Sequence, residues 1–322
     1  QSHKAQLNQA YDDIQSSGNL VDSKYCKSVE TKLKKITGRK HARLFTSGTS
    51  AIQVALLSWN MIDKQVACSN YSFIASANQA ALLNNVEFFD VDKRGLMDTK
   101  QKFQHDLVIP VSLYGNMIDY DKIQIGPGTK VIVDSAQSLG SKYKGRNEGF
   151  FGDASVFSFA SNKPIPTAGT HGALVWDDDV MSDKIKAVSI NGKLHRNGPI
   201  LTYGINAKPF ELQACQIDLG LDYLDKWQLK REQIYEYYKK EFINLPLDII
   251  DAPDYCKSNF PKFAMLSNRR DSLMNYLNDN HIEALMHYTD NFAHFFGSTK
   301  SFPGTDQIRS NIITIPNHQW LS

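Results

Sequence analysis

Short apolar segments alternate with segments of helical periodicity between residues 43 and 176, and this alternation constrains the fold more than any other feature of the sequence. The apolar segments are rich in β-branched and aromatic residues, which is typical of buried strands. They lie at 41–45, 65–70, 86–91, 107–113, 130–134, 154–159 and 172–176. Strands separated by helices form mostly parallel sheets that are covered on both faces. The sequence therefore predicts an α/β fold around a mixed, mostly parallel sheet.

The texture of the chain changes near residue 230, and this change predicts a second, smaller domain. Apolar residues spaced four and three apart predict one long amphipathic helix from Phe210, through Ala214, Ile217, Leu221 and Leu224. Polar helix, proline-containing loops and short strands follow, and Ser267 is expected to cap the next helix. We expect a large domain over residues 1–230, with an N-terminal helical segment, and a small α+β domain over residues 231–322.

Composition excludes several classes of function. Charged residues make up 22% of the 322 residues and the net charge is +2, so neither nucleic acid nor a membrane surface is an expected partner. The four cysteines lack the spacing of a metal site, and no metal is predicted. The sequence has no signal stretch and no apolar run that could span a bilayer. We therefore expect a protein of the reducing cytoplasm.

The predicted strand at 154–159 leads into Lys163, and Pro164 then prevents the strand from continuing. A lysine beside apolar walls loses its proton more easily, because desolvation disfavours the ammonium. A neutral amine is what Schiff-base formation with an aldehyde requires, and Ser158 faces this lysine from the end of the strand. A single loop lysine is usually just solvated. Lys163 therefore gains meaning only from residues at the other strand ends.

Three further strand ends carry suitable groups. Gly48 and Thr49 open a helix after a strand, which favours either a phosphate site or an ordinary capped helix. Phe73 follows the next strand and could stack on a flat ring or join the core. Asp134 ends a buried strand, where it could pair with a protonated ring nitrogen or cap the next turn. Together with Lys163, these are the parts needed to hold pyridoxal 5'-phosphate.

Five segments resemble the DegT/DnrJ/StrS family of pyridoxal-phosphate sugar aminotransferases, and the likeness runs from about residue 18 to the end of the sequence. They are Thr46-Ser-Gly-Thr-Ser-Ala-Ile52, Tyr71-Ser-Phe73, Val133-Asp-Ser-Ala-Gln137, Phe157-Ser-Phe-Ala-Ser-Asn-Lys163 and Gly204-Ile-Asn-Ala-Lys-Pro-Phe-Glu-Leu-Gln-Ala214. Each segment alone is a weak or moderate signal, whereas five in the same order and at matching separations are strong. The resemblance implies the fold type I architecture of pyridoxal-phosphate transferases.

The resemblance also implies a role for each matching residue. Lys163 forms the Schiff base and moves the proton, and Asp134 pairs with the pyridinium nitrogen. Gln137 approaches the phenolic oxygen, and Phe73 stacks on the ring. Asn206 reaches the phosphate of the neighbouring subunit, so a homodimer is implied. The phosphate is held by Gly48, Thr49 and Ser158.

The sequence departs from the family pattern at several positions. The family usually has Gly-Glu-Gly-Gly where this chain has Gly169-Thr-His-Gly172. His171 is expected close to the cofactor or substrate, either as a pH-sensitive contact or as a space-filling side chain. Ser112 stands where the family often has His, and Lys208 where it has Arg. Further candidates for substrate contacts, with a structural role as the alternative, are His287, Tyr288 and Arg196.

The function that the resemblance implies is amino transfer from an amino acid, glutamate by family likeness, to a keto carbon of a nucleotide-linked sugar. The product would serve surface polysaccharide or aminosugar biosynthesis. A sugar dehydratase of the same family is one alternative, but that branch replaces the lysine by histidine and Lys163 argues against it. The other alternative is a non-catalytic protein that binds the cofactor and acts as a regulator or partner, which the altered loop at 169–172 would permit.

Overall fold

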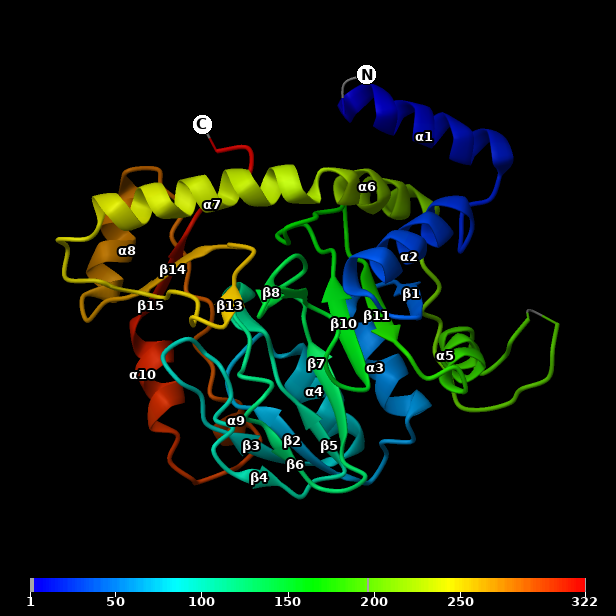
Figure 1. Ribbon diagram of the computed structural model, residues 1–322, viewed down its shortest axis with the longest axis horizontal. Coiled ribbons are helices and arrows are strands. Elements are labelled where there is room, and N and C mark those ends of the chain that lie inside the picture. The colour runs from blue at the N-terminus through cyan, green and yellow to red at the C-terminus, as the bar shows by residue number, and fades with distance from the viewer. Residues whose placement is uncertain (1–2, 196, 322) are drawn as a thin grey trace.

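The computed structural model describes residues 3–195 and 197–321, and its centre is a seven-stranded sheet with the order β1-β11-β10-β7-β5-β2-β3 (Figure 1). Strand β11 runs antiparallel to both neighbours, and all other pairs in the sheet are parallel. The predicted mixed, mostly parallel sheet is therefore confirmed. Its strands are β1 (His41–Phe45), β2 (Gln65–Ser69), β3 (Asn85–Phe89), β5 (Leu107–Ile109), β7 (Lys130–Asp134), β10 (Ala154–Ser158) and β11 (Gly172–Trp176).

Helices cover both faces of the β1 side of this sheet. Alternate residues of each strand point to opposite faces, so neighbouring residues of one strand enter different cores. In β10, Val156 joins a core with α3 (Gly48–Ser58), α4 (Ala75–Leu83) and α5 (Met181–Ser189). Phe157 joins the opposite core with α2 (Lys24–Thr37) and α6 (Glu211–Asp222). Helix α1 (His3–Ser17) packs on α6 through Ala10, Ile14 and Cys215. Both faces of β10 are thus buried, as a strand in the middle of such a sheet requires.

Small strands and one short helix surround the main sheet. The pair β4 (Lys102–Phe103) and β6 (Gln124–Ile125) is parallel. A three-stranded antiparallel sheet joins β8 (Lys142–Tyr143) to β9 (Arg146–Asn147) and to β13 (Cys256–Lys257) from the C-terminal part of the chain. The short 3-10 helix η1 spans Leu113–Gly115.

The C-terminal part contains the long helix α7 (Leu224–Glu241) and an antiparallel sheet of the order β12-β14-β15. Figure 1 shows α6 and α7 running end to end along one side of the molecule. The remaining elements are β12 (Asp248–Ile249), β14 (Phe263–Leu266), α8 (Arg270–Asp279), α9 (Phe292–Phe295), α10 (Pro303–Asn311) and β15 (Ile312–Ile315).

Two predictions in this region are wrong. The helix predicted from Phe210 through Leu224 is not continuous, because Tyr223 separates α6 from α7 with φ −103° and ψ 3°. The apolar spacing continues across this break, so periodicity could not reveal it. Ser267 does not occupy the cap position of α8, which belongs to Arg269. Instead the Ser267 hydroxyl accepts the Arg269 N–H at 3.1 Å, one turn before the helix.

The predicted domain boundary between residues 230 and 231 falls inside α7, and the division stays a prediction. Part of the segment 231–322 returns to the large sheet. Phe292, Ala293 and Phe302 belong to the same core cluster as α3 and α4. The C-terminal segment therefore packs on both the main sheet and the small antiparallel sheet.

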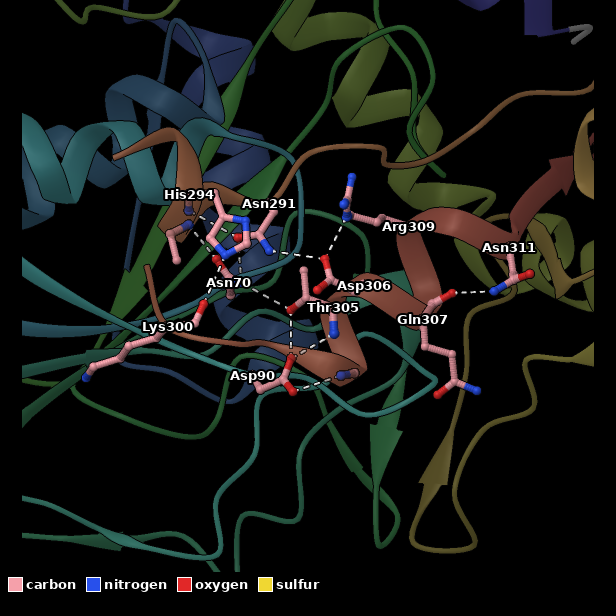
Figure 2. A network of polar contacts seen from close by, with 12 residues as sticks. Asn70, Asp90, Asn291, His294, Lys300, Thr305, Asp306, Gln307, Arg309 and Asn311 are labelled. Atoms are coloured by element: carbon pink, nitrogen blue, oxygen red, sulfur yellow. Dashed lines mark hydrogen bonds and ion pairs between the residues drawn. The ribbon is translucent and has the colours of Figure 1, made fainter. Parts of the chain in front are cut away.

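A buried polar network fastens this returning segment to the end of β2 (Figure 2). The Asn70 amide donates to Asn291 Oδ1 at 3.1 Å and to Thr305 Oγ1 at 3.2 Å. Its oxygen accepts the N–H of Ala293 at 2.7 Å. Asn70 is fully buried, so its three hydrogen bonds satisfy a side chain that would otherwise be costly to bury.

Asp90, which follows β3, makes the second half of this fastening. Its carboxylate accepts the N–H groups of Gly304 at 2.8 Å and Thr305 at 2.7 Å, in the first turn of α10 (Figure 2). A carboxylate at a helix N-terminus satisfies free N–H groups and interacts favourably with the helix dipole. The ends of β2 and β3 thereby fix α9 and α10 against the edge of the main sheet.

Candidate active site

A cavity of about 440 Å³ opens at the carboxyl ends of β1, β2, β7 and β10. This is the edge at which α/β sheets bind ligands. Seven predicted cofactor residues line it, namely Gly48, Thr49, Phe73, Asp134, Gln137, Ser158 and Lys163. The strand ends thus bring together residues that lie more than 100 positions apart in the sequence.

Lys163 lies on the loop that follows β10, where its N–H donates to Ala160 O at 3.0 Å. Burial lowers the pKa of its ammonium group, and the nearby Asp134 carboxylate opposes this shift. The lowered pKa favours the neutral amine, which is the nucleophilic form. The environment predicted for this lysine from the apolar sequence around it is therefore present.

Asp134 ends β7 and is 5% exposed. Its Oδ1 accepts the N–H of Ala136 at 3.0 Å, while the hydroxyl of Ser76 from α4 donates to Oδ2. The two roles considered for this residue are compatible, because the carboxylate closes the next turn and also faces the cavity. Ser76 was not found by sequence reasoning, since a serine on a helix gives no signal of a contact with a distant strand.

The turn that opens α3 is shaped to receive an anion. Ser47 and Ser50 form a capping box, in which Ser47 Oγ accepts the Ser50 N–H at 3.0 Å and Ser50 Oγ accepts the Ser47 N–H at 2.9 Å. The N–H groups of Gly48 and Thr49 precede Ser50 in this first turn, where a helix has no carbonyl partners for them. A Cβ on Gly48 would lie 3.2 Å from the Cβ of Ser158, so glycine keeps this approach open.

Gly172 supports the same turn from below. A Cβ at this position would lie 2.3 Å from Gly48 N and 2.4 Å from the carbonyl group of Ser47. Only glycine allows β11 to begin directly beneath the turn. Gly172 was noted in the sequence only as part of the altered loop, and its packing role was not predicted.

Gln137 is oriented by its neighbours. Its side-chain oxygen accepts the N–H of Tyr114 at 3.1 Å, so its NH₂ group points toward the cavity and donates to Tyr288 Oη at 3.1 Å. The Tyr288 ring also lies 6.0 Å from the ring of Phe73. Phe73 is 53% exposed, which leaves one face of its ring accessible. Tyr288, a candidate substrate contact in the sequence, therefore lines the cofactor cavity together with His287.

His171 lies elsewhere than expected. It is fully buried, does not line the cavity and donates from Nδ1 to the Thr170 carbonyl. Its Nε2 accepts the Phe210 N–H at 3.1 Å, and burial lowers its pKa, which keeps the ring neutral. The expected position close to cofactor or substrate is thus wrong, because the ring turns to link β11 to the start of α6. The space-filling role agrees with this geometry.

Other predicted positions do not line the cavity. Asn206 is exposed and forms an isolated bridge with Ile190. Ser112 is buried and donates to Glu148 Oε1 at 3.0 Å, which gives it a structural partner. Arg196 lies outside the residues that the structure describes. The role of Asn206 across an interface stays a prediction.

The lining residues fit pyridoxal phosphate. The Asp134 carboxylate, the desolvated amine of Lys163 and the start of α3 at Gly48 all line the same cavity. The described residues thus offer a partner for each polar end of the cofactor and an aromatic face for its ring.

Known proteins are similar to this chain over most of its length. A UDP-4-amino-4,6-dideoxy-N-acetyl-beta-L-altrosamine transaminase of Campylobacter jejuni is 31% identical over 277 residues, which cover 78% of this chain and 72% of the relative. A protein of Geobacillus stearothermophilus named a pleiotropic regulatory protein is 24% identical over 302 residues, 88% of this chain and 80% of the relative.

A solved structure of a DegT DnrJ EryC1 StrS aminotransferase from Brucella abortus superposes with a TM-score of 0.90 at 23% identity, over 99% of this chain and 92% of that one. This likeness shows the fold. The sequence model of the DegT/DnrJ/EryC1/StrS aminotransferase family matches residues 1–322. The predicted fold class, enzyme class and cofactor are confirmed by these findings. The chain belongs to the DegT/DnrJ/EryC1/StrS aminotransferase family.

Proposed function

We propose that this chain transfers an amino group from an amino acid, with glutamate as the expected donor, to a keto carbon of a nucleotide-linked sugar. The product would enter surface polysaccharide or aminosugar biosynthesis. Membership of the aminotransferase family, and the substrate in the name of the Campylobacter relative, support this substrate class. The observation that carries the proposal is the placement of Lys163 and Asp134 in one cavity beside the α3 turn.

Each residue has a defined task in this proposal. When bound, pyridoxal phosphate supplies a ring that accepts electrons from the substrate carbon bearing the amino group. Asp134 holds a proton on the ring nitrogen, and Gln137 donates to the phenolic oxygen. The Lys163 amine removes a proton from that substrate carbon, which its desolvated position and lowered pKa favour. Phe73 covers the ring, and the phosphate is held by Gly48, Thr49 and Ser158.

The direct test combines cofactor binding with one half of the reaction. Purified protein mixed with pyridoxal phosphate should turn yellow, and borohydride should fix the cofactor to the peptide that contains Lys163. Adding glutamate should convert the bound cofactor to its amino form, as absorbance and the release of 2-oxoglutarate report. The Lys163→Ala variant should show neither fixation nor conversion. A wild-type protein that stays colourless with excess cofactor would contradict the proposal.

We further propose that the protein forms a homodimer in which Asn206 reaches the phosphate of the neighbouring subunit. Asn206 is exposed, and Thr46 at the phosphate turn bonds to the adjacent Ala207. Large apolar side chains are exposed near these segments, as a self-complementary interface requires: Leu20, Val21, Ile200, Leu201, Tyr203, Phe210 and Leu212. Light scattering should give twice the chain mass, and Tyr203→Glu should reduce it to one chain and weaken cofactor binding.

A non-catalytic role is the second candidate, because the Geobacillus relative is named as a regulatory protein. The glutamate experiment separates the two candidates. A protein that binds the cofactor through Lys163 but releases no 2-oxoglutarate, and reacts with no other amino acid, would favour the regulatory role. In the ranges 3–195 and 197–321, which the structure describes, none of the helices has the length and apolar content of a membrane span. The cytoplasmic location stays a proposal.

A further inference from the structure

A second, smaller cavity of about 230 Å³ adjoins the cofactor cavity. The two cavities share three residues of the lysine loop, Ser161, Asn162 and Lys163. The rest of its lining comes from Pro164, from α7, from the loop before β14, from the loop after α8, and from the end of β15 with the segment that follows it. The two cavities therefore meet at the lysine loop.

Two cations besides Lys163 line this cavity, and neither has a carboxylate partner among the hydrogen bonds of the described residues. Lys262 contacts His287, with 3.4 Å between Nζ and Nε2. Arg231 is 1% exposed and donates to the backbone oxygens of Asn259 at 3.1 Å and Pro164 at 3.4 Å, and to Gln319 Oε1 at 3.0 Å. Its Nη2 is buried and has no partner in the described part of the chain. Glu283 offsets the charge of Lys262 only in part, since burial and Lys163 act more strongly on this ammonium group. Buried charge of this kind is costly unless an anion offsets it.

The surrounding groups leave the cavity positive. His287 is neutral, because burial and the nearby lysines lower its pKa to about 4. The one carboxylate among the described lining residues is Glu283, which is exposed. The amides of the lining are engaged with the protein: Gln319 Oε1 accepts from Arg231 Nη1 at 3.0 Å, and Asn317 Nδ2 donates to Phe260 O at 3.1 Å. What the lining offers a small anion is therefore the positive charge of Lys262 and Arg231.

We propose that Lys262 and Arg231 form the subsite that receives a carboxylate of the amino-acid donor. This inference rests on the proposed function, in which the donor amine reacts at the Lys163 position. A dicarboxylic amino acid placed there can direct one acid group toward Lys262, where a charge-assisted hydrogen bond forms. The cavity is smaller than the 300–1,000 Å³ typical of sites for drug-sized ligands, so a nucleoside diphosphate sugar does not fit inside it.

The test uses glutarate, which has two carboxylates but no amine and so cannot react. Isothermal titration calorimetry on the cofactor-loaded protein should detect glutarate binding. Lys262→Gln should weaken it about 10- to 100-fold, which is the range for losing one hydrogen bond to a charged group. Lys262→Arg should restore most of the affinity. The matched control is Lys257→Gln, because Lys257 pairs with Glu232 outside this cavity and should leave the affinity within about twofold.

The outcomes separate this inference from the proposed function. A loaded protein that converts glutamate, but whose glutarate affinity is equal in wild type and Lys262→Gln, overturns the subsite alone. Absence of glutarate binding by the wild type at millimolar concentration overturns it as well. Loss of UDP binding in Lys262→Gln with unchanged glutarate binding would assign the cations to the nucleotide substrate instead. A protein that never takes up the cofactor contradicts the proposed function itself.

Discussion

The two neighbouring cavities differ in where their residues come from. The cofactor cavity is built at strand ends of the main sheet, within the segments 47–75 and 111–170, with His287 and Tyr288 as additions from the C-terminal part. The smaller cavity takes most of its lining from residues 231–320. The shape of the cofactor cavity is set by the main sheet. The shape of the smaller cavity depends on how the C-terminal segment packs against that sheet. Cofactor chemistry and donor recognition thus rest on different parts of the fold.

This difference predicts that the two functions can be separated by mutation. Substitutions in residues that support the turn at the start of α3 should weaken cofactor binding more than donor binding. Changes in the Asn70 network should damage the smaller cavity first, because that network fastens residues 291–305, which connect the lining residues Glu283 and Leu285 to the lining segment 314–320.

The largest effect is expected from Gly172→Ala. The added Cβ would lie 2.3 Å from Gly48 N, so the phosphate turn must shift. Overpacking of this kind costs about 1–3 kcal/mol, which corresponds to roughly a 5- to 150-fold loss of cofactor affinity if the cost falls on the phosphate turn. Absorbance titration with pyridoxal phosphate measures the loss. Gly145→Ala is the control, because its Cβ would meet nothing within 4 Å, although its φ of +84° adds some strain. Equal cofactor affinities in wild type and Gly172→Ala would contradict the view that the main sheet sets the shape of the cofactor cavity.

A smaller and more selective effect is expected from Asn70→Ala. It removes three hydrogen bonds and leaves buried partners unsatisfied, which should lower the free energy of unfolding by about 2 kcal/mol. Urea unfolding measures this change, and glutarate affinity should fall more than cofactor affinity. Asn311→Ala is the matched control, since its single hydrogen bond to Gln307 O is exposed and its loss should change stability by less than about 0.5 kcal/mol.

The pH dependence of cofactor capture tests the burial of Lys163. Because burial lowers the pKa of this amine, capture should accelerate with rising pH and level off below the usual lysine value of about 10.4. Asp134→Asn removes the charge that favours the ammonium, so its profile should shift to lower pH. Stopped-flow absorbance measures the rate, and N-acetyl-lysine methylamide corrects for ionisation of the cofactor. A plateau at the exposed-lysine pH would show that the amine is solvated.

The smallest effect is expected from Tyr288→Phe. This change removes the acceptor for the Gln137 NH₂ group, a contribution of about 1 kcal/mol, and should weaken cofactor binding about fivefold. A double-mutant cycle with Gln137→Ala measures the coupling by absorbance titration. Additive effects would mean that Tyr288 acts on the cavity independently of Gln137, and the C-terminal contribution to the cofactor cavity would then be packing alone.

The cofactor cavity was largely predictable because its residues follow regular strands. Lys163 and Asp134 stand next to apolar segments, and parallel strands must bring their carboxyl ends to one edge. Gly172 was harder, because its need for a missing Cβ depends on the turn that packs above it. His171 was misplaced for the same reason, since the direction of its ring is set by the backbone of Phe210, a contact distant in sequence.

The smaller cavity gave almost no signal in the sequence. Lys262 lies in a loop of ordinary composition, and Arg231 lies on a polar stretch of α7 that reads as solvated. Their proximity depends on long-range contacts of the C-terminal segment, such as the bond from Arg231 to Pro164 O. The break at Tyr223 was hidden too, because the apolar spacing continues through it.

The reversed direction of β11 has a practical consequence for engineering the protein. Its first residue lies at the cavity edge, while Trp176 pairs with His41, at the start of β1 and thus at the opposite edge. The turn at 177–180 that follows is exposed. A peptide tag or fluorescent reporter inserted in that turn sits a full strand length from the chemistry, whereas the same insertion only a few residues before Gly172 would enter the floor of the cavity.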